Sequence, residues 1–426
     1  MHDRLRKNCC RLVFLLAVAA PTVSMLTWGL ARNTSLVASQ TRLYWQQQLT
    51  DMLGMQVRLT AVETPRPGLT VLQSLQLSDR ETGVPCGTIA TVELWKVAEK
   101  QHVRIEDPQM QISEASGTWR WVVQQLLRRH DLGTVVISTG PLVLESSGRK
   151  SATSLQGMEL ACHLQSVPEC TTLTINMQQP GSGKAPVALQ LRRQHKETVG
   201  TQVTLDTASV PLPCSLLVPL FPRLAAMGEQ AHFQGQLSAE QTTAGQVIDV
   251  AGDFHAVDLQ QWLGAMSAGG LTGFATLHLQ PARIMDDICV QASGRLVAEN
   301  GMVKRSFLQR AAAELGLQWV HDLGSEQAGY DRLSCRFDLD KTGIQLSGET
   351  RGSATGVILS HPRGVLLSAT GRPQRLPSQA LARSMGVPAA VGLPVSRSGL
   401  QQLQGASRRP VLQARPTSQL NPTLPR

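Results

Sequence analysis

Apolar and polar residues alternate at a period of two in many short segments of this 426-residue chain. Examples are LTINMQ, VALQLR, ATLHLQ and RFDLD, and glycine, proline, asparagine or aspartate separates most of these segments. Neighbouring side chains of a β-strand point to opposite faces, so each segment would bury one face and expose the other. The sequence therefore predicts a mainly β protein with many short strands. Because aromatic residues make up only 4% of the chain, its core has to be aliphatic.

Helical patterns are few. Leu36, Leu43, Met52 and Leu53 lie near helical spacing, and Gly54 would end that helix. Further short helices are predicted at residues 118–130, 222–228, 259–266 and 304–317. Strands thus outnumber helices and do not alternate with them, which argues against a doubly wound nucleotide-binding fold.

The segment GRLVAENGMVKRSFLQRAAAELGL, residues 294–317, predicts a strand, a tight turn at Asn300 and Gly301, and a helix opened by Lys304. Residues 250–266 have a similar order, with a glycine, a short strand and then an amphipathic helix. Two loose copies of such a unit are compatible with a sheet that grows by repetition.

An uncharged run at residues 12–31, LVFLLAVAAPTVSMLTWGLA, has about the length of a membrane-spanning helix. Four basic residues precede it, a pattern that would keep residues 1–11 in the cytoplasm and export the rest. Alanines within the run also allow a cleaved signal peptide. We expect a single-pass anchor, because the run is longer than the apolar core of a typical signal peptide.

The formal charge of +9 comes from the two ends of the chain. Residues 372–426 contain eight arginines, eight prolines and no acidic residue, and without both ends the body is slightly acidic. The charge therefore does not indicate a nucleic-acid-binding face. Residues 372–426 are predicted to be a disordered basic arm. This arm would tether the protein to an anionic surface or a partner protein, or would be a solvated tail without a partner.

Six cysteines follow the predicted anchor, on the side of the membrane where disulfides persist. Cys162 and Cys170 are the one pair close enough in sequence to suggest a local bridge, across the segment HLQSVPE. Scattered buried thiols are the alternative.

No motif in the sequence predicts catalysis, a metal site or a cofactor. PGSGKAP, residues 180–186, lacks the first glycine of a phosphate-binding loop and has Ala185 in place of the magnesium-binding hydroxyl residue, so a hairpin turn is predicted there. Asp286 and Asp287 are adjacent and would point to opposite faces of a strand. Single histidines lie in or beside predicted strands, where surface roles are expected: His102, His195, His232, His255 and His278. We therefore expect a non-enzymatic protein that presents a surface.

Both ends of the predicted exported body resemble a known family. The opening VRLTAVETPRPGLTVLQSLQLSDRETG and VRIEDPQMQI, together with the closing YDRLSCRFDLDKTGIQLSG, are similar to AsmA-like and TamB-like envelope proteins. This resemblance implies an inner-membrane anchor and an elongated, curled antiparallel β-sheet with a few short helices in the periplasm. It also implies an apolar groove that handles phospholipid in the cell envelope, either by moving it toward the outer membrane or by maintaining the lipid balance of that membrane.

Alternating aliphatic residues are the candidates for lining such a groove, where burial is worth about 0.8 kcal/mol per CH₂ group. An ordinary closed core is the alternative for any of them. The candidates are Val135, Ile137, Leu173, Ile175, Val187, Leu189, Leu191, Leu277 and Leu279.

The expected organisation is a cytoplasmic N-terminus (residues 1–11), a transmembrane helix (12–31), an exported β-rich body (32–371) and the basic tail (372–426). Some twenty strands would give a groove roughly 100 Å long if all of them joined one sheet. The predicted partners are the membrane and phospholipid acyl chains, with no nucleic acid. The alternative function is an envelope scaffold that binds a protein partner through its body or tail.

Overall fold

The structure is a computed structural model. It describes residues 35–80, 82–113, 126–128, 133–147, 152–181, 183, 185–195, 200–242, 245–264, 270–286, 288–320, 324–349, 356–369 and 375–384. The predicted anchor at 12–31 and the chain beyond residue 384 lie outside the described residues, as does most of the predicted helix at 118–130. Within the described ranges, no helix is both long and apolar enough to cross a membrane.

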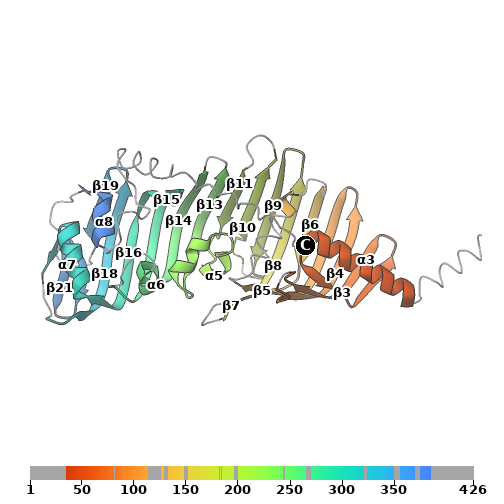
Figure 1. Cartoon of the computed structure of the whole chain (residues 1–426), viewed down its shortest axis with the longest axis horizontal. Coiled ribbons are helices and arrows are strands. Elements are labelled where there is room, and N and C mark those ends of the chain that lie inside the picture. The colour runs from red at the N-terminus through yellow and green to blue at the C-terminus, as the bar shows by residue number, and fades with distance from the viewer. Residues whose placement is uncertain are drawn as a thin grey trace, which may run out of the picture.

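One large mixed sheet of 22 strands runs through the described part of the chain, so the prediction of a mainly β protein is confirmed (Figure 1). The strands of the first half are β1 (Gln56–Arg58), β2 (Ala61–Arg66), β3 (Leu69–Ser78), β4 (Pro85–Val97), β5 (Lys100–Ser113), β6 (Thr134–Thr139), β7 (Leu142–Ser147), β8 (Ala152–Ser166), β9 (Cys170–Gln178), β10 (Val187–Gln194) and β11 (Thr201–Asp206). Those of the second half are β12 (Leu212–Pro213), β13 (His232–Thr242), β14 (Gly245–Asp258), β15 (Phe274–Met285), β16 (Ile288–Lys304), β17 (Leu317–Trp319), β18 (Gln327–Asp340), β19 (Gly343–Gly348), β20 (Val357–His361), β21 (Gly364–Ala369) and β22 (Arg375–Leu376).

The strands follow one another across the sheet nearly in chain order, from β3 through β8, β9 and β10 to β16 and β18. Five pairs of strands share one position each. Four of these pairs have a common neighbour: β1 with β2, β6 with β7, β11 with β12, and β19 with β20. The fifth is β21 with β22, which pair with β20 and β19 respectively. The 22 strands therefore occupy 17 positions.

One part of the sheet is parallel, which corrects the prediction of a purely antiparallel sheet. β5 pairs in parallel with β6 and then with β7, whereas its other neighbour, β4, is antiparallel. Parallel neighbours need a crossover connection, here residues 114–133. Its described piece, residues 126–128, is helical, and Leu127 is buried.

Residues with an unusual backbone conformation lie side by side across strands β3 to β5. Ser74 in β3 and Asp107 in β5 both have positive φ, at 53° and 47°. The registers of β3, β4 and β5 place both residues opposite Ala90. The break between β6 and β7, at Gly140 and Pro141, falls on the same line. Positive φ is energetically unfavourable for residues other than glycine, so pairing with the neighbouring strands has to stabilise these conformations.

Short helices lie against the sheet at several points along its length (Figure 1). They are α3 (Ser35–Leu53), α5 (Cys214–Leu217), the 3₁₀ helix η2 (Pro222–Met227), α6 (Leu259–Gly264), α7 (Arg305–Leu315) and α8 (Ser378–Ser384). The helices predicted at 222–228, 259–266 and 304–317 are present as η2, α6 and α7, although α7 is shorter than predicted and Leu317 begins β17. The predicted helix that stops at Gly54 is also confirmed. α7 buries Leu308, Ala311 and Leu315, a helical spacing, and ends at Gly316 in the left-handed conformation.

The prediction of a tight turn at Asn300 and Gly301 was wrong. β16 continues straight through both residues, and Gly301 pairs with Tyr330 of β18. Asn300 does adopt φ of 55°, as an Asn-Gly turn would require, but the backbone stays in the ladder. The Tyr330 hydroxyl donates to the Thr272 carbonyl at 2.7 Å and leaves no room for a side chain on Gly301. Pairing with β18 therefore overrides the local turn preference.

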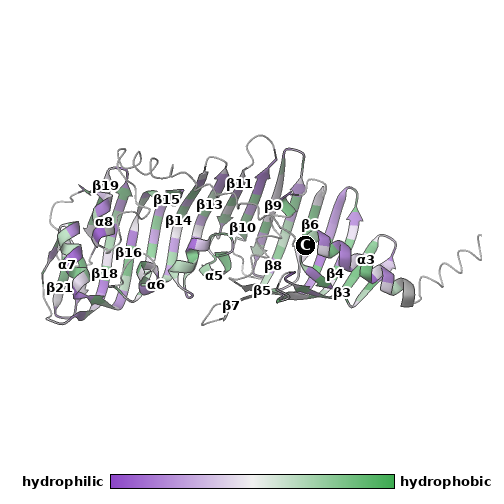
Figure 2. Cartoon of the chain, in the orientation of Figure 1, coloured by the Kyte–Doolittle hydropathy of each residue, from purple (hydrophilic) through white to green (hydrophobic). Residues whose placement is uncertain are grey.

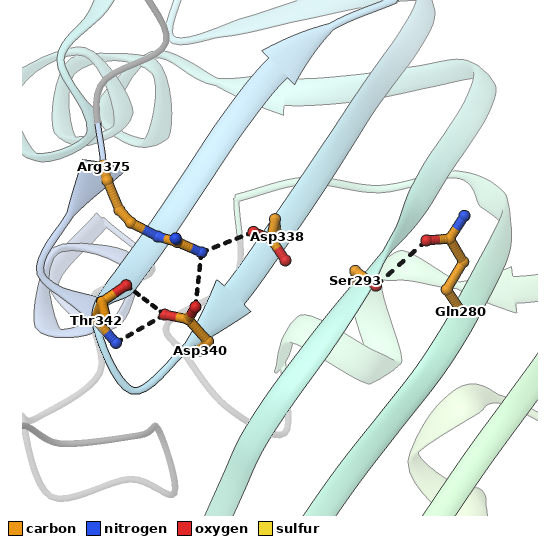
Figure 3. A network of polar contacts seen from close by, with 6 residues as sticks. All are labelled: Gln280, Ser293, Asp338, Asp340, Thr342 and Arg375. Carbon is orange, nitrogen blue, oxygen red and sulfur yellow. Dashed lines mark hydrogen bonds and ion pairs between the residues drawn. The ribbon is translucent and has the colours of Figure 1, made fainter.

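The boundary predicted at residue 372 was also wrong. Arg375 of β22 contacts Asp338 at 2.7 Å and Asp340 at 3.0 Å, both on β18 (Figure 3). A hydrogen bond from the Thr342 hydroxyl, with its backbone N–H and Arg375 adding to the effect, lowers the pKa of Asp340. In α8, Arg383 forms an ion pair with Glu314 of α7 at 2.9 Å. The folded body thus extends to residue 384 at least.

Candidate functional site

The strand register places alternate apolar side chains of the central strands on one face of the sheet, here termed the apolar face. Ile137 on β6 lies opposite Cys162 on β8, which lies opposite Ile175 on β9. Ile175 in turn pairs with Leu189 on β10, and Leu205 on β11 continues the row. Opposed residues have Cβ atoms about 4.5–5.5 Å apart, so these side chains form an unbroken apolar row.

A second apolar row runs beside the first, two residues along each strand. It consists of Val135, Leu164, Leu173, Leu191 and Val203. Towards the C-terminal end, Leu277 on β15 lies opposite Leu296 on β16, which lies opposite Cys335 on β18. None of these positions carries a charge. Alternation along each strand is visible in Figure 2 as successive hydrophobic and hydrophilic segments.

All nine predicted lining residues belong to this face, but their exposure differs. Five are buried: Val135, Leu173, Val187, Leu191 and Leu277. Four are half-buried: Ile137, Ile175, Leu189 and Leu279. Ile137, Ile175 and Leu189 share the row that also contains the half-buried Cys162. This run of partly exposed aliphatic side chains, here termed the half-buried row, is the best candidate for contact with an apolar ligand.

Helices cover the apolar face on one side of the half-buried row. Leu217 of α5, Leu224 of η2 and Leu259 of α6 belong to one core cluster with Phe233 and Phe254. The two phenylalanine rings pack with their centroids 4.8 Å apart. Val187 and Leu277 are members of the same cluster. These two predicted lining residues therefore lie in a closed core.

The opposite face of the sheet is polar and carries ion pairs. Arg283 on β15 contacts Asp249 on β14 at 2.7 Å, and this hydrogen bond raises the pKa of Arg283. His278 pairs with Asp253 on the same two strands. On β18, Arg336 donates to Glu349 at 2.8 Å. These groups are substantially exposed, so this face is solvated and the two faces of the sheet differ sharply in polarity.

The predicted bridge between Cys162 and Cys170 is not formed, and both residues are free thiols. Cys162 lies opposite Ile175, and Cys170 is five residues from Ile175 along β9, which corresponds to about 17 Å. A disulfide needs Cα atoms within about 7 Å. The odd separation from Ile175 also places Cys170 on the polar face. Burial raises the pKa of Cys162 to about 11 and that of Cys214 to about 12, so both are protonated at neutral pH.

The residues considered for catalysis lie apart from one another. PGSGKAP connects β9 and β10, which pair antiparallel, so the predicted hairpin is confirmed. Asp286 lies in the turn after β15 and accepts a hydrogen bond from the Gln246 N–H at 2.8 Å; its neighbour at position 287 lies outside the described residues. His102 stacks on Trp95. Over the described ranges, no three His, Cys, Asp or Glu residues gather as metal ligands would.

The sequence did not predict a buried polar contact at one rim of the apolar face. Thr171 is fully buried, and its Oγ1 lies 2.8 Å from Nε2 of His195 and 3.1 Å from Oγ of Ser166. The three residues come from β8, β9 and the end of β10, so only strand pairing brings them together. Because Thr171 has no exposed surface, its hydroxyl is inaccessible to a substrate, and the contact satisfies buried polar atoms.

No protein-family model matches the chain, and no curated protein matches its sequence.

Proposed function

We propose that the chain is a membrane-anchored, non-enzymatic, AsmA-like envelope protein that holds phospholipid acyl chains against its apolar face. The observation that carries the proposal is the half-buried row, in which strand register aligns Ile137, Cys162, Ile175 and Leu189 without a charge. The opposite face is charged and solvated. A sheet with this asymmetry would present one continuous apolar strip to a ligand that is itself linear and apolar.

Acyl chains fit such a strip energetically. Each CH₂ group that contacts the protein rather than water contributes about 0.8 kcal/mol. An acyl chain that has left a bilayer is therefore held only if many of its groups contact the protein. A row of side chains that crosses several strands meets this condition, because neighbouring strands lie about 4.8 Å apart and each strand adds another contact along the acyl chain. In this proposal the sheet is elongated and curled, the anchor is at residues 12–31, and the body lies on the periplasmic side of the inner membrane.

The test is a pair of substitutions on β10, made in the full chain. Leu189→Asp places a carboxylate on the half-buried row, and Gln190→Asp places the same charge on the next residue, which is exposed on the polar face. Protein purified from membranes in mild detergent is analysed by native mass spectrometry, and the bound phospholipid is extracted and quantified. Since a charge beside acyl chains costs more than about 1.4 kcal/mol, Leu189→Asp should lower lipid occupancy about tenfold or more. Gln190→Asp should retain it.

Leu191→Asp completes the series, because Leu191 is 2% exposed. This variant should unfold, which separates damage to the core from loss of a ligand. Unfolding of Leu189→Asp as well would place the half-buried row in a closed core. A folded wild-type chain without stoichiometric phospholipid would contradict the lipid function outright.

A closed scaffold that binds an envelope protein is the second candidate. It is favoured by the burial of five of the nine lining residues and by the helices over Val187 and Leu277. A lipid-free wild-type chain that retains a partner protein through its body or basic tail would support the scaffold.

A further inference from the structure

We propose that the outward face of α3 docks on the headgroup region of the membrane that holds the anchor. This inference rests on the proposed anchor at residues 12–31, and it adds a second, surface contact between the folded body and that membrane. It assigns a partner to a helix face that exposes two large apolar side chains among largely uncharged residues and is uncovered by the rest of the described chain.

Two large apolar side chains of α3 point away from the sheet. Leu43 is 58% exposed and Tyr44 is 63% exposed, and both are flanked by the exposed glutamines Gln40 and Gln47. Between residues 38 and 48 the one charged side chain is Arg42, which is half-buried. The same face carries one charge, the exposed Asp51, one turn beyond Gln47 at the end of α3. A helix face in water normally carries several charges, so the outward face of α3 is unusually poor in them.

The other side of α3 is firmly attached to the sheet. Leu49 is buried in a cluster with Met55, Val57 and Leu72, and Trp45 packs against that cluster. Gly54 ends the helix in the left-handed conformation, and its N–H donates to the Thr50 carbonyl. Any contact made by Leu43 and Tyr44 therefore also fixes the orientation of the sheet.

Chain length places α3 beside the membrane. Residue 31 ends the uncharged run and α3 begins at Ser35, so the connection spans at most about 14 Å. Tyr44 lies another 14 Å or so along the helix axis, because a helix rises 1.5 Å per residue. If α3 stood upright on the membrane, Leu43 and Tyr44 would be far out in water. If α3 lies along the surface, both side chains enter the headgroup region.

The chemistry of this face fits a membrane–water interface. Tyrosine is enriched there because its ring is apolar and its hydroxyl remains wet, and uncharged glutamines have little cost of desolvation compared with charged groups. A protein partner is the competing occupant. The membrane surface is favoured over a protein partner, because the short connection to the proposed anchor keeps α3 near the bilayer whether or not a partner is present. Docked in this way, α3 would hold the N-terminal end of the apolar face next to the lipid that it is proposed to receive.

Photo-crosslinking from Tyr44 tests the proposal. Benzoylphenylalanine replaces Tyr44 in the full chain, and a matched variant carries it at Phe274, an aromatic residue 53% exposed on β15 in the second half of the sheet. Each protein is reconstituted into vesicles of phosphatidylethanolamine with a minority of phosphatidylglycerol, floated on a density gradient, irradiated and analysed by mass spectrometry. We expect lipid adducts at Tyr44 at least tenfold more abundant than at Phe274.

Protein adducts at Tyr44 in place of lipid adducts would overturn the proposal and show that a partner or second copy covers the face. Equal lipid labelling at both positions, or none at Tyr44 in protein that floats with the vesicles, would also overturn it. These results would not contradict lipid binding at the half-buried row, because lipid occupancy there is measured separately in detergent-purified protein. A chain that does not float with the vesicles would overturn the anchor itself, and with it both proposals.

Discussion

At the scale of single residues, two glycines on neighbouring strands set the geometry of the main core. Gly235 on β13 and Gly252 on β14 lie opposite each other, with φ of 147° and 144°. A Cβ atom on either would lie 2.3 Å from a backbone oxygen of the other strand. Glycine alone allows this backbone approach, next to the paired rings of Phe233 and Phe254.

Gly252→Ala should therefore destabilise the protein by about 2–4 kcal/mol, because both the positive φ and the close carbonyl oppose a side chain. Urea unfolding followed by tryptophan fluorescence would show a lower midpoint. Gly264, the last residue of α6, has nothing within 4 Å of its Cβ position and no positive φ. Gly264→Ala should change the free energy of unfolding by less than about 1 kcal/mol. Similar losses in the two variants would contradict the steric explanation.

At the scale of elements, β22 and α8 close the C-terminal end of the sheet. Ala380 is buried in the main core, and Leu376 and Leu381 pack against a second cluster formed by β15, β16, β18 and β19. Arg375 and Arg383 add ion pairs to β18 and α7. The ion pairs are largely exposed and contribute little, so the apolar contacts dominate.

Two truncations test this role. A chain that stops after residue 384 should keep the free energy of unfolding of the full chain. A chain that stops after residue 374 should lose about 2–4 kcal/mol, because it uncovers the apolar surface beneath Leu376, Ala380 and Leu381. Thermal unfolding followed by circular dichroism would distinguish them. Equal stability of both truncated chains would show that β22 and α8 are dispensable for the fold.

At the scale of the whole molecule, the sheet is long (Figure 1), and its terminal strands β1 and β17 do not pair with each other. Seventeen positions at about 4.8 Å give a length near 77 Å. This is shorter than the roughly 100 Å expected from the number of strands, because five pairs of strands share a position. A single molecule of this length is too short to be expected to bridge two membranes, so transfer of lipid across an envelope would need a partner.

Small-angle X-ray scattering on residues 35–384 should detect this shape. A slab about 77 Å long, 40 Å wide and 25 Å thick has a radius of gyration near 26 Å. A compact domain of about 350 residues would give about 20 Å. A value near 20 Å would mean that the sheet closes on itself, which would also remove the open apolar strip.

Much of this architecture could be predicted because a period of two reports which face a side chain occupies. Leu173 and Ile175 on β9 share a face for that reason alone, as do Leu189 and Leu191 on β10. α7 was predictable because Leu308 and Leu315 follow helical spacing and Gly316 ends the helix. The failures share one cause, contact between segments distant in sequence. Pairing with β18 keeps Asn300 inside a strand, and ion pairs and apolar contacts order residues 375–384 despite their disordered composition.

The sequence by itself determined that this protein is mainly β, which side chains of each strand share a face, and that its core is largely aliphatic, with few aromatic residues such as Phe233 and Phe254. These properties depend on local chemistry and short periods. Only the tertiary structure decided the parallel pairing of β5 with β6, the burial of Val187 and Leu277 beneath helices, and the partial exposure of Ile175 and Leu189. Burial depends on what a distant part of the chain places over a surface, and no local pattern contains that information.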